Sequence, residues 1–303
     1  MDLPDPISAI GEQLSGGGAI TPTPEFFEAY EVFGAELSNI FVKPWLVVDH
    51  ASRLGEDNSY FRLDVGSRSI VLVRETAECM HALRNACLHA GYRICDEEDG
   101  KGNHLFCYYH GWDYALDGRL TDPELRPEIE DRSRFRLPRY AMQIRRGLIF
   151  VDLSVAGPNP PEPGPIELGA VPEDLGDRVV TRRQRHPTTW NWKHLRDFLW
   201  QRKELVFPAG ECDTAIEFGA LSFIAAQGEE AVLVRLVPRF PGHTDIDLVR
   251  MAPRGAAPAA GDEDRVAAAV RDAGGAIAAE PLAALSPGFY QWYWSALSAP
   301  ARN

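Results

Sequence analysis

Short alternating runs of apolar and polar residues dominate the chain after Pro44. Residues 60–65 and 70–74 alternate in this way on either side of a Gly-Ser pair. This arrangement predicts a β-hairpin, because successive side chains of a strand point to opposite faces of the sheet. Further strands are expected around residues 105–106, 112–114 and 148–151. The pattern therefore predicts a small all-β domain over residues 43–154.

The flanking segments follow other patterns. Apolar residues at steps of three and four predict an amphipathic helix over residues 24–40, in an N-terminal lead-in (1–42) that packs on a second domain. Residues 155–168 are expected to be an extended linker, because their many prolines fix φ and lack an amide donor. Residues 169–303 combine strand patterns with helical ones. The strand patterns lie at 221–224, 231–237 and 245–250, and the helical patterns lie at 189–207, 262–279 and 287–297. The chain as a whole is predicted to be α+β.

Composition and charge narrow the classes of function. The 303 residues include 44 acidic and 31 basic side chains, for a net charge of −13, which argues against nucleic-acid binding through bulk electrostatics. The sequence has no long apolar run and no signal-peptide pattern at its N-terminus, so we expect no membrane association and a cytoplasmic location. Five cysteines, an odd number, favour metal ligation over a disulfide framework.

Two short motifs of the all-β region carry the candidate chemistry. A C-x-H motif formed by Cys87 and His89 is followed, after 17 residues, by a C-x-x-H motif formed by Cys107 and His110. Two cysteines and two histidines are a common ligand set for a structural zinc ion. Because each motif offers one thiolate and one imidazole, the set also suits a [2Fe–2S] cluster. One iron would then take both thiolates and the other both imidazoles, which raises the potential to about −150 to +300 mV.

The sequence around these motifs resembles the α subunits of Rieske non-haem iron oxygenases, which hydroxylate aromatic rings and act in aromatic compound degradation. The likeness covers nearly all of residues 25–155 and is strongest in three segments, 84–91, 107–112 and 114–120. It implies an all-β Rieske domain whose [2Fe–2S] cluster is bound by the two motifs. It also implies that Trp112 packs over this cluster and limits the access of water.

The positions beside the motifs indicate which kind of Rieske protein this is. Respiratory-chain Rieske proteins join their cluster loops by a disulfide, and the corresponding residues here are Tyr92 and Tyr109. The resemblance therefore implies the oxygenase or ferredoxin type. Cys79 and Cys95 have no partner spacing and are expected to be packing residues, and His81 and His104 are expected in surface or loop positions.

For the second domain, the resemblance implies a helix-grip (START-like) fold with an antiparallel sheet. In the family this fold binds one iron through two histidines and a carboxylate. The segment 191–193 (Asn-Trp-Lys) and the bridging carboxylate, Asp197, match the family, and Asp264 is the nearest match to the third ligand. No histidine occurs from residue 195 to residue 242, and the two ligand positions hold Lys203 and Phe207. A mononuclear Fe(II) is therefore expected to be absent.

These observations predict an electron-transfer and structural subunit. The resemblance implies its partners, because α subunits of this family assemble head to tail as trimers in which each cluster lies close to the iron of the neighbouring subunit. The expected partners are an intact α-type subunit in such a ring, whose iron receives the electrons, and a ferredoxin or an NAD(P)H-dependent reductase. The alternative is a self-sufficient mono- or dioxygenase with an atypical iron site built from His186, His194 and Asp264. A free-standing Rieske ferredoxin would explain the cluster but not the large second domain.

Overall fold

A computed structural model of the chain describes residues 3–17, 19–42, 45–66, 68–121, 134–160, 164–207, 210–256, 265–279 and 285–298. The chain divides into two compact units. We call Pro44–Glu167 the β unit, and Met1–Lys43 together with Leu168–Asn303 the α/β unit. Among the described helices, none is both long and apolar enough to cross a membrane.

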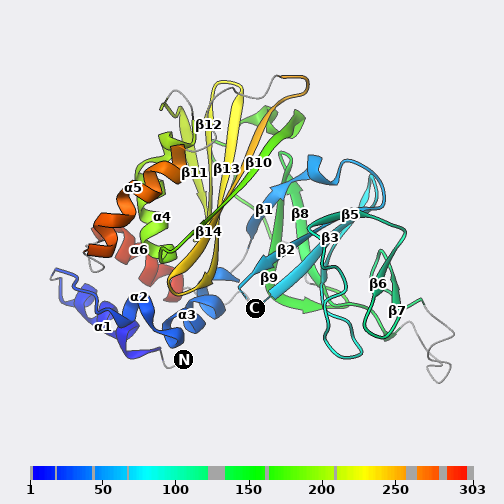
Figure 1. The fold of residues 1–303 in the computed structure, drawn as a ribbon, viewed down its shortest axis with the longest axis horizontal. Helices are drawn as coiled ribbons and strands as arrows, with labels where there is room; N and C mark the ends of the chain where they lie inside the picture. The colour runs from blue at the N-terminus through cyan, green and yellow to red at the C-terminus, as the bar shows by residue number, and fades with distance from the viewer. Residues whose placement is uncertain are drawn as a thin grey trace. The chain divides into compact units, whose positions relative to one another are not determined.

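The β unit consists of antiparallel sheets (Figure 1). A seven-stranded sheet has the order β1-β9-β8-β4-β3-β2-β5, and β6 and β7 form a separate two-stranded sheet. The strands are β1 (Leu46–His50), β2 (Ser59–Val65), β3 (Arg68–Thr76), β4 (Cys79–Arg84), β5 (Asp99–Lys101), β6 (His104–Cys107), β7 (Trp112–Ala115), β8 (Arg139–Arg145) and β9 (Leu148–Gly157), with a 3-10 turn, η2 (Ala51–Leu54), after β1.

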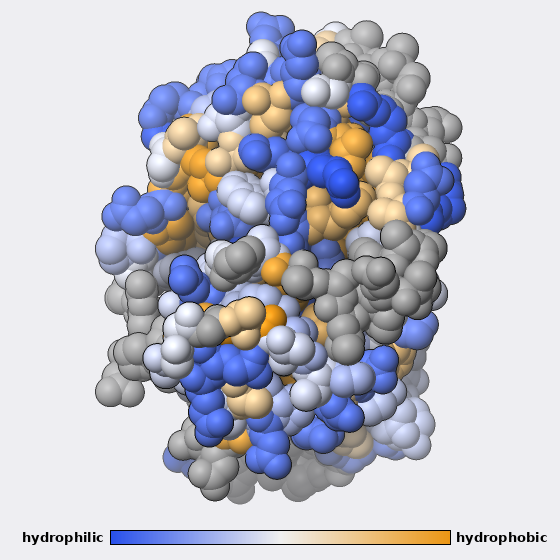
Figure 2. Space-filling model, turned by 90° about the vertical axis from the view of Figure 1, so that its left-hand side faces the viewer, coloured by the Kyte–Doolittle hydropathy of each residue, from blue (hydrophilic) through white to orange (hydrophobic). Residues whose placement is uncertain are grey.

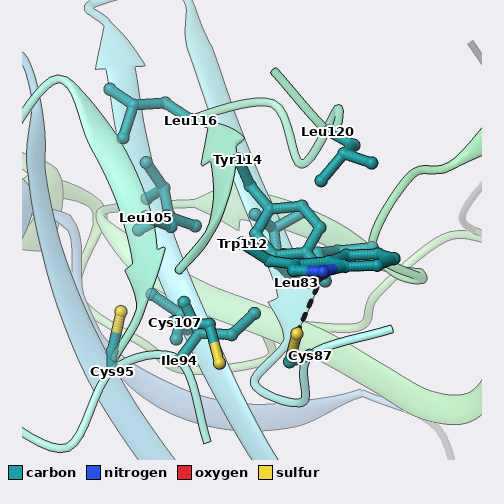
Figure 3. Packing of buried hydrophobic residues seen from close by; sticks show 13 residues of the cluster. Leu83, Cys87, Ile94, Cys95, Leu105, Cys107, Trp112, Tyr114, Leu116 and Leu120 are labelled. Atoms are coloured by element: carbon teal, nitrogen blue, oxygen red, sulfur yellow. Dashed lines mark hydrogen bonds between the residues drawn. The ribbon is translucent and has the colours of Figure 1, made fainter. Parts of the chain in front are cut away.

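The predicted hairpin is present as β2 and β3. Leu63 pairs with Ile70 in its register, and the alternate residues Phe61, Leu63 and Val65 of β2 are buried. The core of the β unit continues from β3 and β4 to the two-stranded sheet, where Cys87, Cys107, Trp112 and other side chains pack together (Figure 3). The same burial that stabilises the sheet thus fixes the segments that carry the C-x-H and C-x-x-H motifs.

The α/β unit has one five-stranded antiparallel sheet of order β10-β14-β13-β12-β11. The helices α4, α5 and α6 lie to one side of this sheet (Figure 1). The helical elements are α1 (Asp5–Gly16), α2 (Glu25–Glu28), α3 (Tyr30–Glu36), the π-helical η1 (Leu37–Phe41), the 3-10 turns η4 (Glu173–Asp177) and η5 (Lys203–Val206), α4 (Trp192–Gln201), α5 (Arg265–Ala279) and α6 (Pro287–Ser298). The strands are β10 (Arg178–Thr188), β11 (Thr214–Phe218), β12 (Ser222–Gln227), β13 (Glu230–Phe240) and β14 (His243–Pro253).

The helix expected over residues 24–40 is interrupted. Ala29 is extended (ψ 132°), so the segment forms α2, α3 and η1 instead. The carbonyl oxygens of Phe26 and Phe27 accept hydrogen bonds from the side chains of Lys193 and Asn191, at 2.8 and 2.7 Å. Because side chains 167 and 164 positions away satisfy these carbonyls, the helix can break there without loss of hydrogen bonding. The helix expected over residues 189–207 is likewise shorter, and consists of α4 followed by η5.

Figure 2 shows the side on which α1 and α5 lie in Figure 1. On the part of this face that is not grey, hydrophobic residues are separated by hydrophilic ones and form no single large patch. Scattered apolar residues of this kind are normal on a protein surface.

Candidate metal centre

The two motifs form loops with the same local design. The Gly91 amide donates to the Cys87 carbonyl at 2.8 Å, and the Gly111 amide donates to the Cys107 carbonyl at 2.9 Å. Each glycine has a positive φ, 75° and 74°, that other residues rarely adopt. Each loop therefore turns back on its own cysteine and presents one cysteine and one histidine toward the other loop.

The four candidate ligands are arranged as two pairs. The thiols of Cys87 and Cys107 are buried, whereas His89 and His110 are exposed, with their Nδ1 atoms 2.9 Å apart. No three of these four residues, all of them described, bring their ligand atoms within 4.8 Å of one another. A single tetrahedral zinc would hold all four atoms within about 3.8 Å of one another. The geometry therefore fits a binuclear group, with thiolates at one end and imidazoles at the other, better than a single zinc ion.

Tyr114 on β7 connects the cysteine loop to the core. Its hydroxyl lies 3.2 Å from Cys87 Sγ and accepts a hydrogen bond of 3.0 Å from the Leu88 amide (dashed line to Cys87 in Figure 3). Burial raises the pKa of the Tyr114 phenol well above its usual range, so the group stays neutral and keeps its proton to donate. Since the Leu88 amide occupies the oxygen, the hydroxyl proton is free to point at the sulfur.

Asn85 fixes the other end of the first loop, a role that sequence reasoning missed. Its side chain is buried, donates to the Cys95 carbonyl at 2.7 Å and accepts hydrogen bonds from the amides of Ile94 and Cys95. A buried amide with all these partners holds one conformation. The only signal in the sequence was its place two residues before Cys87, within the segment that resembles the family.

Aromatic rings surround the histidine pair. Trp112 is stacked on His89 with centroids 5.3 Å apart, and Tyr92 is stacked on Tyr109 at 3.8 Å. The tyrosine pair thus joins the two loops at the positions where the respiratory type has its disulfide. Tyr108 is 87% exposed, and Tyr92, Tyr109 and Leu88 are also exposed.

Asp197 on α4 is buried and fully engaged within the α/β unit. Its two carboxylate oxygens accept hydrogen bonds from Ser286 Oγ at 2.6 Å, the Ser286 amide at 3.1 Å and Gln201 Nε2 at 2.8 Å. These contacts connect α4 to the residue that precedes α6. The predicted bridging carboxylate therefore has a clear structural role.

Lys203 and Phe207, the residues at the two expected ligand positions, lie just after the end of α4. Lys203 begins η5, with its Nζ 5.3 Å from the Trp200 ring centroid. Phe207 is completely buried, and its carbonyl accepts a hydrogen bond of 2.7 Å from Arg265. Asp264, the predicted third ligand, lies outside the described residues. The Phe207 side chain has no donor atom for a metal, and the Lys203 ammonium has no free lone pair.

The segment 191–193 has a structural role that explains its presence. Lys193 is buried and forms an ion pair of 2.6 Å with Glu36 on α3. The same carboxylate accepts hydrogen bonds of 2.7 Å from Trp192 Nε1 and from the Tyr293 hydroxyl. Asn191 caps α4 by accepting from the Lys193 amide at 2.9 Å. This network joins α3, α4 and α6, and it requires no bound metal.

His186 and His194 line one cavity of about 660 Å³ in the α/β unit. Residues of β10, the start of α4 and α5 form its walls, and His194 is stacked on Phe27 at 4.4 Å. In the part of the chain that the structure describes, the two histidines do not gather with a third ligand within 4.8 Å.

The remaining cysteines of the β unit differ from each other. Cys95 is buried in the core, and burial raises the pKa of its thiol to about 12, as suits a packing residue. Cys79 is half-buried, and its sulfur lies 3.4 Å from His81 Nε2. Cys79 was expected to be a packing residue, and it lies on β4 beside this imidazole. The expectation that His81 occupies a surface or loop position is wrong, because His81 lies on β4 and its side chain is only 10% exposed.

Comparison with known proteins agrees with this geometry. Residues 44–140 match the sequence family described as Rieske [2Fe-2S] domain. The carnitine monooxygenase oxygenase subunit of Escherichia coli K12 is 29% identical over 181 residues, which are 57% of this chain and 47% of that protein. The glycine betaine monooxygenase oxygenase subunit of Pseudomonas aeruginosa UCBPP-PA14 is 31% identical over 174 residues, 55% of this chain and 40% of that protein. The matches thus span about half the length of these relatives, or less.

Solved structures show the same fold. The apo form of a quaternary ammonium Rieske monooxygenase superposes with a TM-score of 0.67 at 16% identity, over 90% of this chain and 92% of that chain. Naphthalene 1,2-dioxygenase from Rhodococcus sp. gives 0.59 at 16% identity, over 84% of this chain and 79% of that chain. The fold prediction, a Rieske domain followed by a domain with an antiparallel sheet, is therefore confirmed. Residues 44–140 are a Rieske [2Fe–2S] domain, in a chain whose homologues are the α subunits of Rieske oxygenases.

Proposed function

We propose that Cys87, His89, Cys107 and His110 bind the Rieske cluster and that the chain serves as an electron-transfer subunit of an oxygenase. The observation that carries the proposal is the arrangement of the ligands in a buried thiol pair and an exposed imidazole pair. When bound, the cluster takes up and gives away one electron at a time. The chain's own residues enclose the sulfur end and leave the imidazole end at the surface, where electrons can leave.

The surface around the imidazoles suits a protein partner. Tyr92, Tyr108, Tyr109 and Leu88 are exposed beside the histidine pair. Tyrosine is enriched at interfaces because it offers a large apolar face and a polar end. We infer that an intact α-type subunit docks here, with its iron as the electron acceptor, and that a ferredoxin or an NAD(P)H-dependent reductase supplies the electrons.

The side chains at positions 197, 203 and 207 of the α/β unit support electron transfer to a neighbouring subunit rather than to an iron in the same chain. Lys203 is a cation without a lone pair when protonated, and Phe207 has no donor atom and lies in the core. Asp197 already accepts three hydrogen bonds from Ser286 and Gln201. A self-sufficient oxygenase would need ligands of another kind.

Iron counting tests the proposal directly. We expect two irons and two acid-labile sulfides per chain, and no oxygen-dependent product from the chain alone. Mass spectrometry of the metal content checks the iron count. An assay for product after the chain has been reduced by a reductase checks the expected lack of turnover. Three irons per chain, or turnover by the pure chain that an iron chelator abolishes, would contradict the electron-transfer role.

Replacing Tyr114 by phenylalanine is expected to lower the reduction potential by about 50 mV. The variant removes a hydroxyl 3.2 Å from Cys87 Sγ. A hydrogen bond to sulfur stabilises the reduced cluster, and one of about 1 kcal/mol corresponds to roughly 40–50 mV for one electron. Spectroelectrochemistry measures the shift. Tyr60→Phe, in the same unit, serves as the control, and an unchanged potential in Tyr114→Phe would contradict the role of the hydroxyl.

Replacing Asp197 by asparagine is expected to affect stability and not electron transfer. The amide keeps one acceptor oxygen but turns an NH2 group toward the donors of Ser286 or Gln201. We expect unfolding to become easier by about 1–2 kcal/mol. The rate of product formation in a complex reconstituted with an intact α-type subunit should change little, whereas Cys87→Ala should abolish it. If Asp197→Asn lowered the rate of product formation as much as Cys87→Ala, Asp197 would act in electron transfer.

A self-sufficient oxygenase remains a second candidate because His186 and His194 line the same cavity. In this alternative an iron would be bound by these two imidazoles together with Asp264, which lies outside the described residues. Replacement of both histidines by alanine separates the two candidates. The variant should keep two irons per chain under the electron-transfer proposal, whereas the oxygenase would fall from three irons to two.

A further inference from the structure

A second group of metal-ligand side chains lies in the β unit. Glu75 on β3 and Cys79 and His81 on β4 bring one carboxylate oxygen, one thiol and one imidazole nitrogen within 4.8 Å of one another. The separations are 3.4 Å from Cys79 Sγ to His81 Nε2, 3.7 Å from Cys79 Sγ to Glu75 Oε2 and 3.2 Å from His81 Nε2 to Glu75 Oε2. None of these residues belongs to the two cluster loops.

These separations match one tetrahedral zinc ion. With ordinary zinc–sulfur, zinc–nitrogen and zinc–oxygen bond lengths, the expected separations are about 3.6, 3.6 and 3.4 Å. The observed values of 3.4, 3.7 and 3.2 Å differ from them by about 0.2 Å or less. We propose that Glu75, Cys79 and His81 bind a zinc ion, with water at the fourth position.

The strand geometry explains why the three side chains converge. Val73 pairs with His81 across the hairpin, so Val73, Glu75, Cys79 and His81 share one face by alternation. A register irregularity falls at Glu75, between the pairs Arg74–Met80 and Thr76–Cys79. Bulges of this kind redirect a side chain. This face is apolar at Val73, which lies in the core. Toward the turn between β3 and β4 it carries the side chains of Glu75, Cys79 and His81.

The charges around the site also suit a divalent cation. A Glu75 carboxylate and a Cys79 thiolate together balance the charge of Zn²⁺. The nearby guanidinium of Arg139 lies 3.8 Å from the Asp117 carboxylate and donates to the Asp117 carbonyl at 2.7 Å, so its charge is partly compensated. Burial lowers the pKa of His81, so the imidazole is neutral near pH 7. On binding, the thiol proton passes to solvent and the sulfur–metal bond replaces the sulfur–hydrogen bond.

The other interpretation is a hydrogen-bond triad in which the Cys79 thiol and the His81 imidazole both donate to Glu75 Oε2. The test uses the full chain with its iron–sulfur cluster loaded, so that the cluster ligands are occupied. Zinc is titrated by calorimetry, and zinc per chain is measured after dialysis. We expect one zinc per chain, which Cys79→Ala and His81→Ala weaken by about 100-fold or more, because even outer-shell losses cost 10–100-fold.

Two matched controls and a second measurement keep the test independent of misfolding. Cys212→Ala and His104→Ala remove a thiol and an imidazole that lie outside the triad, and zinc affinity should be unchanged in both. In the unmutated chain, zinc should protect Cys79 from alkylation while Cys212 reacts as before. Three results would overturn the proposal. They are no zinc binding by the unmutated chain, zinc affinity in the Cys79→Ala and His81→Ala variants equal to that of the unmutated chain, or alkylation of Cys79 that zinc does not slow.

Discussion

Replacing Lys193 by methionine is expected to destabilise the α/β unit by about 3–5 kcal/mol, the cost of leaving one partner of a buried ion pair without its counter-charge. Glu36 is completely buried, so the variant leaves its carboxylate with only the Trp192 and Tyr293 donors. Chemical denaturation measures the loss as a lower midpoint. The network joins three helices, so the effect should extend over the whole unit.

The control for this prediction is Lys203→Met, which removes the same charge from a position near the end of the same helix. Its ammonium group lies 5.3 Å from the Trp200 ring centroid, and loss of such a contact costs about 0.5–1 kcal/mol. A double-mutant cycle with Glu36→Gln measures the coupling between the two charges. A loss in Lys193→Met no greater than in Lys203→Met would show that the buried pair does not stabilise the fold.

Replacing His110 by cysteine is expected to lower the reduction potential of the cluster by roughly 100 mV or more. A thiolate adds negative charge where a neutral imidazole was, and clusters with four thiolates have potentials near −400 mV, against about −150 to +300 mV for two imidazoles. The exposed position of His110 leaves room for the smaller side chain. Potentiometry with absorption and electron paramagnetic resonance spectra checks both the potential and the ligand change.

His104→Cys is the matched control for this substitution. His104 is an exposed histidine of the same unit, with its Nδ1 3.2 Å from the Asp113 carboxylate, and it belongs to neither motif. The same exchange of imidazole for thiol there should leave the potential and the spectra unchanged. If His110→Cys also left both unchanged, His110 would not be a cluster ligand.

The sequence by itself determined the features that depend on residues close together along the chain. The spacing of Cys87 from His89 and of Cys107 from His110 pointed to one metal centre held by two short motifs. The alternation in residues 60–65 and 70–74 predicted the hairpin of β2 and β3. Such patterns are readable because strand periodicity and positive-φ turns act over only a few residues.

Only the tertiary structure decided which distant residues meet. Lys193 pairs with Glu36, and Asp197 with Ser286, across 157 and 89 positions of the chain, and packing of helices sets these contacts. The triad of Glu75, Cys79 and His81 lies within one hairpin, yet its convergence depends on strand register and on an irregularity at Glu75. Register is fixed by which face is buried, so spacing alone could not show that these three side chains face one another.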